Sequence, residues 1–196
     1  PLGWTVSALP DTSGEVDWQG TSSFEVAVTV PADALSGTHG LFTMRADSAN
    51  SEANATQTFE IVVDQHYGVA LSVGADSKEA EPGATVDFSF DVSNTGNGED
   101  TFAITVDGNP AWNPIASQSD ITVGAVSNGQ FIVSVTVPAD RDAGSDSGGI
   151  SVTVTSLDNK TVDSLNITAA ASQVYDISLA HSSGSDGNVI VSQDTS

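Results

Sequence analysis

The sequence predicts an all-β protein made of antiparallel β-sandwiches that follow one another in tandem. The first observation behind this prediction is strict alternation, because Val86, Phe88, Phe90 and Val92 alternate with polar residues, as in a strand with one buried face. The second is the lack of helical periodicity in a chain rich in β-branched residues and in Gly, Asn and Asp turns. The third is an internal repeat, which also indicates how the chain is divided.

The repeat is visible as a motif that returns at a fixed distance. The residues VTVPAD at 28–33 recur at 135–140, with the prolines separated by 138 − 31 = 107 positions. Trp4 recurs as Trp112, where 112 − 4 = 108, and two tyrosines have the same spacing. Similarity at a fixed period is the signature of a repeat array. A period near 108 matches the roughly 100 residues of an immunoglobulin-like sandwich with Greek-key connections.

The strands of one complete repeat can be placed in order from their apolar residues. A turn is expected at 81–83 and a Gly/Asn hairpin at 94–98, and Pro138 ends the fourth run. The residues expected to face the core are Val69, Leu71 and Val73, then Val86 to Val92 as above, then Phe102, Ile104 and Val106, then Phe131, Val133, Val135 and Val137, then Ile150, Val152 and Val154. Their counterparts in the preceding repeat are Phe24, Val26, Val28 and Val30, followed by Phe42, Met44 and Ala46.

The period predicts three repeats in this sequence. Residues 1–64 are the C-terminal part of repeat 1, residues 65–172 are a complete repeat 2, and residues 173–196 are the first strand of repeat 3 or a strand that pairs with a neighbour. A half-repeat leaves strand edges and an apolar face open. Either the missing strands belong to a longer chain of which this sequence is an excerpt, or a neighbouring copy donates a strand.

A resemblance to a known family rests on a set of motifs in the complete repeat. These are the residues 83–86, 94–97 and 100–102, then Trp112, then 137–140 with Gly144 and Ser156. With these motifs the chain resembles the immunoglobulin-like repeats of archaeal and bacterial cell-surface and secreted proteins, of the CARDB and NPCBM-associated type. The resemblance covers the complete repeat and both partial ones. It implies an extracellular role in adhesins, surface layers (S-layers), stalks or accessory modules of secreted hydrolases, and it implies no catalytic residue.

The charge of the chain excludes several classes of partner. Four basic residues face 26 acidic ones, which gives a formal net charge of -22. Such a charge repels nucleic acids and anionic lipids, and its self-repulsion predicts a salty environment, as for a halophilic or marine archaeon. No apolar window is long enough for a transmembrane helix, so no direct membrane insertion of this segment is expected. The lack of cysteine excludes disulfides and zinc-thiolate sites.

Three Asn-x-Ser/Thr sequons make Asn54, Asn159 and Asn166 the glycosylation candidates. If Leu165 and Ile167 face the core, alternation turns Asn166 outward. Asn159 lies in an expected turn and is exposed in the same way. The alternative is chance, because sequons are frequent in sequences rich in Asn and Thr.

The strongest candidate for a metal site is a calcium loop after the fourth run, with Asp140, Asp142 and Asp146 as ligands. Calcium needs several oxygen ligands, and three closely spaced carboxylates begin to supply them. Against this reading, the spacing is not that of an EF-hand and Arg141 lies within the loop. The alternative is solvated surface acid. No other cofactor is expected.

The sequence predicts a structural protein and not an enzyme. The three histidines are scattered, and no nucleophile motif or phosphate-binding loop is present. The expected function is therefore a rod of repeated units in a cell-surface layer or filament, with other copies or neighbouring repeats as partners. The alternative is an adhesion or carbohydrate-binding accessory module of a larger secreted enzyme. In that case Trp18, which has no counterpart in the repeat, is the aromatic residue expected to contact glycans, whereas the aromatics that recur are expected to pack.

Overall fold

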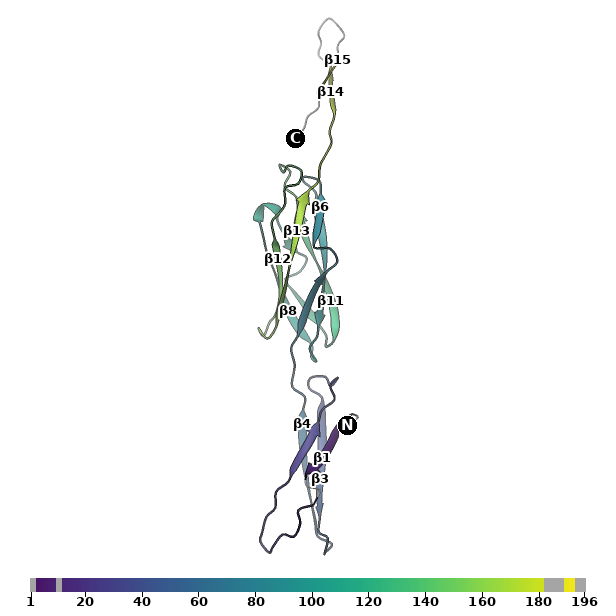
Figure 1. Cartoon of the computed structure of the whole chain (residues 1–196), viewed down its shortest axis with the longest axis vertical. Coiled ribbons are helices and arrows are strands. Elements are labelled where there is room, and N and C mark those ends of the chain that lie inside the picture. The colour runs from purple at the N-terminus through teal and green to yellow at the C-terminus, as the bar shows by residue number, and fades with distance from the viewer. Residues whose placement is uncertain (1–2, 10–11, 182–188, 193–196) are drawn as a thin grey trace. The chain divides into compact units, whose positions relative to one another are not determined.

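The computed structural model describes residues 3–9, 12–181 and 189–192. The chain divides into two compact units. Unit 1 contains Pro1–His66 and Gly96–Gly98, and unit 2 contains Tyr67–Thr95 and Glu99–Ser196. In the described ranges the elements are β-strands and one 3-10 turn, with no α-helix (Figure 1). The all-β prediction is therefore confirmed.

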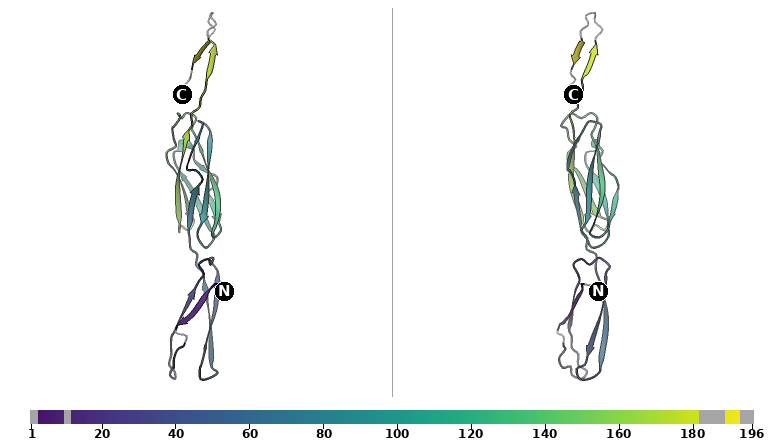
Figure 2. Two further views of the ribbon diagram at one scale, coloured as in Figure 1. Left: turned by 45° about the vertical axis from the view of Figure 1, so that its right-hand side comes forward. Right: turned by 90° about the vertical axis from the view of Figure 1, so that its right-hand side faces the viewer.

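Unit 2 is a β-sandwich of two sheets, which Figure 2 shows from two sides. One sheet has five strands in the order β10 (Asp120–Val123), β8 (Asp100–Asp107), β12 (Ile150–Ser156), β13 (Val162–Ala171) and β6 (Ser77–Ala80). The other has four strands in the order β5 (Val69–Val73), β7 (Thr85–Asn94), β11 (Ser127–Thr136) and β9 (Ile115–Ala116). The antiparallel sandwich predicted from alternation is thus confirmed. The hairpin expected at 94–98 is wrong, because the strands on either side of it, β7 and β8, lie in different sheets.

One strand pair in unit 2 is parallel, which alternation does not predict. The first part of the sandwich, β5, pairs with β7 in the four-stranded sheet. After a short break the chain crosses to the other sheet, where β6 pairs with β13 in parallel. The beginning of unit 2 therefore contributes a strand to both sheets and ties them together along one side.

The core of unit 2 lies between the two sheets and follows the alternation in the sequence. Phe90 and Phe131, from neighbouring strands, stack with ring centroids 5.1 Å apart and an interplanar angle of 8°. Trp112 is the last residue of the short 3-10 turn η1 (Pro110–Trp112), and its side chain is buried. The turn begins after Asn109, whose side chain accepts a hydrogen bond from the Ala111 amide. The other buried hydrophobic residues are Leu71, Phe88, Val92, Phe102, Ile104, Val123, Val133, Val135, Val137, Ile150, Val152, Val154, Ile167, Ala169 and Ala171.

The described residues of unit 1 form two strand pairs. The pair β1 (Thr5–Leu9) and β2 (Glu25–Thr29) is antiparallel, and so is the pair β3 (His39–Asp47) and β4 (Asn54–Val62). The Trp4 ring lies 5.6 Å from that of Phe42, which in turn lies 5.5 Å from Phe59. These three rings are only partly buried. Of the predicted inward residues of repeat 1, Phe24, Val30 and Ala46 are exposed, so the expectation is wrong for these three. Ala46 lies near the end of the β3–β4 pair, and Phe24 and Val30 flank β2, whose other edge is not paired in the described residues.

The strand registers of the two units correspond residue by residue. In unit 1 Ala8 pairs with Val26. In unit 2 Ala116, 108 positions after Ala8, pairs with Val133, 107 positions after Val26. Likewise Phe42 pairs with Phe59, and Ile150 with Ile167, each 108 positions further along. The pair β1–β2 of unit 1 therefore corresponds to the pair β9–β11 of unit 2, and the pair β3–β4 corresponds to the pair β12–β13.

The C-terminal segment contains a short antiparallel pair, β14 (Ser178–His181) with β15 (Val189–Ser192). The segment 173–196 was expected to supply the first strand of a third repeat, and part of it, 182–188 and 193–196, lies outside the described residues. The division into three repeats therefore stays a prediction.

Candidate binding and modification sites

The candidate calcium loop lies between β11 and β12 in unit 2. Asp140 and Asp142 line a hollow of about 360 Å³, together with Arg141. The loop is fixed to the end of β13 by two backbone hydrogen bonds of 2.8 Å, in which Gly144 donates to the Ala171 carbonyl and the Ala171 amide donates to Ser145. The loop is therefore held in place by the sheet, and the two exposed carboxylates project from it.

The third carboxylate of this loop has a different local role. Asp146 does not line the hollow, and its Oδ1 accepts a 2.9 Å hydrogen bond from the Gly148 amide. Among the described residues no three His, Asp or Glu side chains form a group that could hold a metal ion. The structure thus brings two of the three expected ligands to one place, next to a guanidinium, and leaves calcium binding at Asp140, Asp142 and Asp146 a prediction.

The three glycosylation candidates are all exposed. Asn166 lies on β13 between the half-buried Leu165 and the buried Ile167, so its outward orientation is as predicted. Asn159 lies in the turn after β12, with a left-handed φ of 53°. Asn54 is the first residue of β4, and its Nδ2 donates to the Glu52 carbonyl over 3.3 Å. All three side chains are accessible to a modifying enzyme, and their glycosylation stays a prediction.

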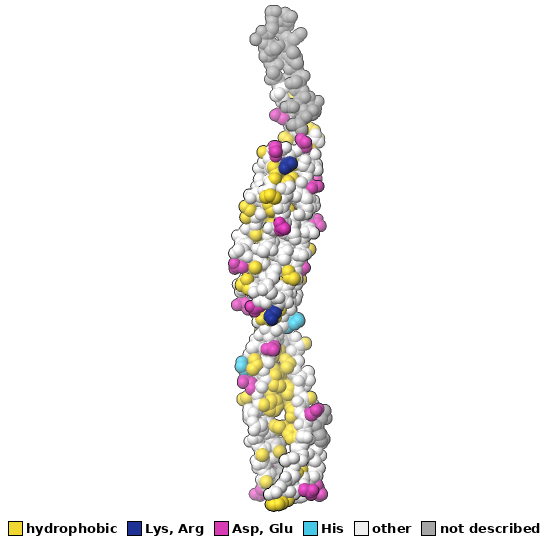
Figure 3. All heavy atoms as spheres, turned by 90° about the vertical axis from the view of Figure 1, so that its left-hand side faces the viewer, with side chains coloured by type: hydrophobic (Ala, Val, Ile, Leu, Met, Phe, Trp, Pro, Cys, Tyr) yellow, Lys and Arg dark blue, Asp and Glu magenta, His cyan; other side chains and the backbone are white. Residues whose placement is uncertain are grey.

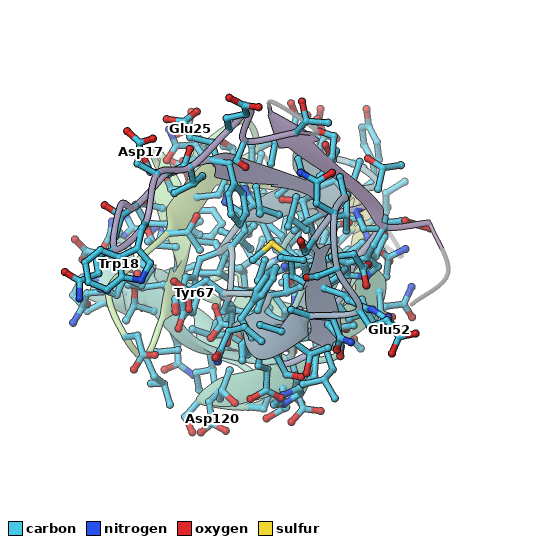
Figure 4. The ribbon with its side chains drawn as sticks, turned by 90° about the horizontal axis from the view of Figure 1, so that it is seen from below. Asp17, Trp18, Glu25, Glu52, Tyr67 and Asp120 are labelled. Atoms are coloured by element: carbon cyan, nitrogen blue, oxygen red, sulfur yellow. The ribbon has the colours of Figure 1, made fainter. Side chains whose placement is uncertain are left out.

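Trp18 is the most exposed aromatic side chain in the described ranges, with 88% of its surface accessible. It lies between β1 and β2, within a turn closed by a 2.7 Å hydrogen bond from the Gly20 amide to the Asp17 carbonyl. Figure 4 shows its side chain projecting outward at the margin of the view. Its exposure agrees with the expectation that Trp18 is the aromatic residue free to contact a ligand.

The aromatics that recur in the repeat were expected to pack, and this holds for three of the four. Trp112 is buried, and Trp4 packs against a phenylalanine of β3. Tyr67 is partly buried, and its hydroxyl donates to Asp158 over 3.3 Å. Tyr175 is 82% exposed, so the expectation is wrong for this residue. Its position is equivalent to that of Tyr67, but the described residues place no second sheet against it.

Asp163 is a polar contact between the sheets that the sequence reasoning missed. It begins the inward-facing series of β13 that continues with Leu165 and Ile167. Its Oδ2 accepts a 2.8 Å hydrogen bond from the amide of Leu71, on β5 of the other sheet. A carboxylate therefore satisfies an amide at the edge of the four-stranded sheet. The alternation of β13 could have indicated this contact, because it places an acidic residue at a position where a core-facing side chain is expected.

On the face of the molecule seen in Figure 3, acidic side chains are spread along the surface. Among the described residues there are two ion pairs, His39 with Glu60 at 2.8 Å and Arg45 with Asp47 at 2.7 Å, and all four side chains are more than half exposed. With four basic residues for 26 acidic ones, most carboxylates cannot be paired in this way. The described residues contain no helix with the length and apolarity needed to cross a bilayer.

No family model and no curated protein sequence matches this chain. Among solved structures, domains 1–6 of the surface layer protein SbsC are 14% identical with a TM-score of 0.38, over 96% of this chain and 24% of that one. Domains 4 and 5 of SbsC are 10% identical with a TM-score of 0.38, over 87% and 98%. A family 123 glycoside hydrolase from Clostridium perfringens is 7% identical with a TM-score of 0.41, over 56% of this chain and 28% of the hydrolase chain.

Proposed function

We propose that this chain is a structural, non-catalytic part of an extracellular protein, in which immunoglobulin-like sandwiches follow one another and form a rod in a cell-surface layer or filament of a prokaryote. The observation that carries the proposal is the correspondence of strand registers between units 1 and 2, with pairs such as Phe42–Phe59 and Ile150–Ile167 at a spacing of 108. Units repeated at a fixed period are suited to a spacer or building block, because each unit contributes its own length to the array.

The composition of the surface supports the same role. A net charge of -22 keeps neighbouring molecules apart in low salt, whereas monovalent salt screens the repulsion within about 10 Å at 0.1 M. The exposed sequons and the resemblance to the CARDB-type repeats of cell-surface and secreted proteins both support a location outside the cell. Assembly would then depend on salt or divalent cations, as expected for a marine or halophilic organism.

The location and the assembly can be tested together. An antibody raised against unit 2 is applied to intact cells, and surface material released from them is imaged by negative-stain electron microscopy. We expect surface labelling, and labelled fibres or lattices with a regular repeat. Labelling only after the cells are broken, or labelled particles that are always dispersed monomers, would count against the proposal.

A second candidate function is carbohydrate binding as an accessory module. It is favoured by one observation, the 88% exposure of Trp18, since an exposed indole can stack on a sugar ring. A glycan array probed with the chain and with Trp18→Ala tests it. Loss of a glycan signal in the variant supports this function, and the absence of any signal with the unchanged chain removes it.

A further inference from the structure

In unit 2 the strands β11 and β12 each have a neighbouring strand on both sides. Along its whole length β11 pairs with β7, and on its other side it pairs with β9. In the second sheet, β12 lies between β13 and β8. The two strands β7 and β8 are consecutive in the chain, so one connected segment fills both places.

In unit 1 the corresponding places are open. The strand β2 corresponds to β11 and pairs with β1, and β3 corresponds to β12 and pairs with β4. Within the described part of the chain, no strand pairs with the other edge of β2 or of β3. These two edges are the ones that β7 and β8 occupy in unit 2. An open strand edge presents backbone donors and acceptors that another strand can bind.

The apolar side chains of unit 1 are exposed where their equivalents are buried. Phe24 is 42% exposed, whereas its counterpart 107 positions further along the sequence, Phe131, is 3% exposed. Val30 is 36% exposed, and its equivalent Val137 is fully buried. On the face of unit 1 seen in Figure 3, hydrophobic side chains form a lengthwise strip. The side chains in unit 1 are thus those of a sandwich core, but part of the cover is missing.

We propose that the open side of unit 1, which consists of the free edges of β2 and β3 and the apolar face between them, binds two consecutive strands of the β7–β8 kind, one in each sheet. The occupant is a segment equivalent to residues 65–108, supplied by a repeat of the same kind on the same polypeptide. In unit 2 this segment directly precedes the residues it covers, so a covalently joined copy reaches its place without any linker. Its effective concentration is correspondingly high.

The chemistry of the occupant follows from unit 2. It must carry large apolar residues at alternate positions, as Phe88, Phe90 and Val92 do, because these side chains meet β11 and the opposite sheet. Its first strand must also offer an antiparallel edge to β2, as β7 does to β11, and its second strand an antiparallel edge to β3, as β8 does to β12. Binding by strand addition combines these two requirements, with the backbone giving affinity and the alternate side chains giving specificity.

The test places a second copy of residues 65–108 directly ahead of Pro1 and follows amide hydrogen exchange by mass spectrometry. We expect the amides of β2 and β3 to exchange more slowly than in the original chain, by on the order of tenfold or more. The matched control carries Phe88→Asp and Phe90→Asp in the added copy alone, and it is expected to give no such protection. Exchange in unit 2 serves as an internal reference, since that unit is unchanged in all three chains.

The outcomes separate this inference from its alternatives. Equal exchange in the two grafted chains would overturn it. If β2 and β3 are already protected in the original chain, and this protection is lost on dilution or on deletion of 173–196, the occupant is the tail of a second copy and the proposed source is wrong. The inference depends on the repeat and not on the location of the protein, so surface labelling of cells can fail while the graft succeeds.

Discussion

Two phenylalanines at equivalent register offer the sharpest test of the structural reasoning. Phe131 and Phe24 occupy corresponding positions in β11 and just before β2, yet they are 3% and 42% exposed. We expect Phe131→Ala to destabilise unit 2 strongly and Phe24→Ala to destabilise unit 1 only slightly. The difference arises because one side chain lies between two complete sheets and the other lies on an open face.

The magnitudes follow from burial. Replacement of a buried Phe by Ala costs about 3–5 kcal/mol, which includes the cavity that remains, and Phe131 also loses its stacking on Phe90. Burial of a whole Phe side chain contributes about 1.5–3 kcal/mol by transfer alone. Phe24 is about 58% buried (100 − 42), so its removal should cost about 1–1.5 kcal/mol, without a cavity term because water reaches the site.

The assay is guanidinium unfolding with a probe in each unit. In a Trp4→Phe, Trp18→Phe background, the buried Trp112 reports on unit 2 alone. Unit 1 is followed by amide hydrogen exchange of β3 and β4, because a single unfolding free energy is not defined for a chain with two units. A cost below about 1.5 kcal/mol for Phe131→Ala would refute the placement of this ring in the core. An equal cost for both variants would mean that the open face of unit 1 is already covered.

Further predictions concern the sheet contact, the acidic loop, the surface charge and the sequons. Asp163→Ala should destabilise unit 2 by about 1–3 kcal/mol in the same unfolding assay, because the amide of Leu71 loses its acceptor, and Asp163→Asn should recover part of the loss. If the loop 140–146 binds calcium, the melting temperature rises with calcium beyond its value in NaCl of matched ionic strength, and Asp140→Asn with Asp142→Asn abolishes the rise; no difference between the two salts would exclude the site. Screening of a net charge of -22 predicts that 1 M NaCl or KCl raises the melting temperature equally, by several degrees, since about 1 kcal/mol corresponds to roughly 4–8 °C for a domain of this size. Glycosylation predicts added sugar mass on natural material at one or more of the three sequons, and an unmodified mass would rule it out.

Much of unit 2 could be predicted from alternation because its two sheets bury one face of each strand. Phe88, Phe90, Val133 and Val135 were expected to face the core, and all four are buried. The same reasoning gave the outward orientation of Asn166, since a shift of one residue moves a side chain to the other face of the sheet. These features depend on the order of residues within one strand.

The candidate site was predicted less completely. The three aspartates of the loop 140–146 are close in sequence, but Asp146 caps the Gly148 amide while Asp140 and Asp142 line the hollow. Spacing along a loop does not fix the direction of its side chains, because loop backbone has no period. The local pattern could single out Asp163 as an acidic residue at a core-facing position, but not its partner, because that amide lies 92 positions away.

The sequence by itself determined that the chain is all-β, which positions of the main strands of unit 2 are apolar, and that motifs and apolar positions recur about 108 positions apart. Only the tertiary structure decided which strands are neighbours, that β6 crosses to pair in parallel with β13, and that Phe24 and Tyr175 are exposed while their equivalents are covered. The physical reason is that alternation reports which face of a strand is apolar, whereas burial and edge pairing depend on segments far away in the chain that lie against it.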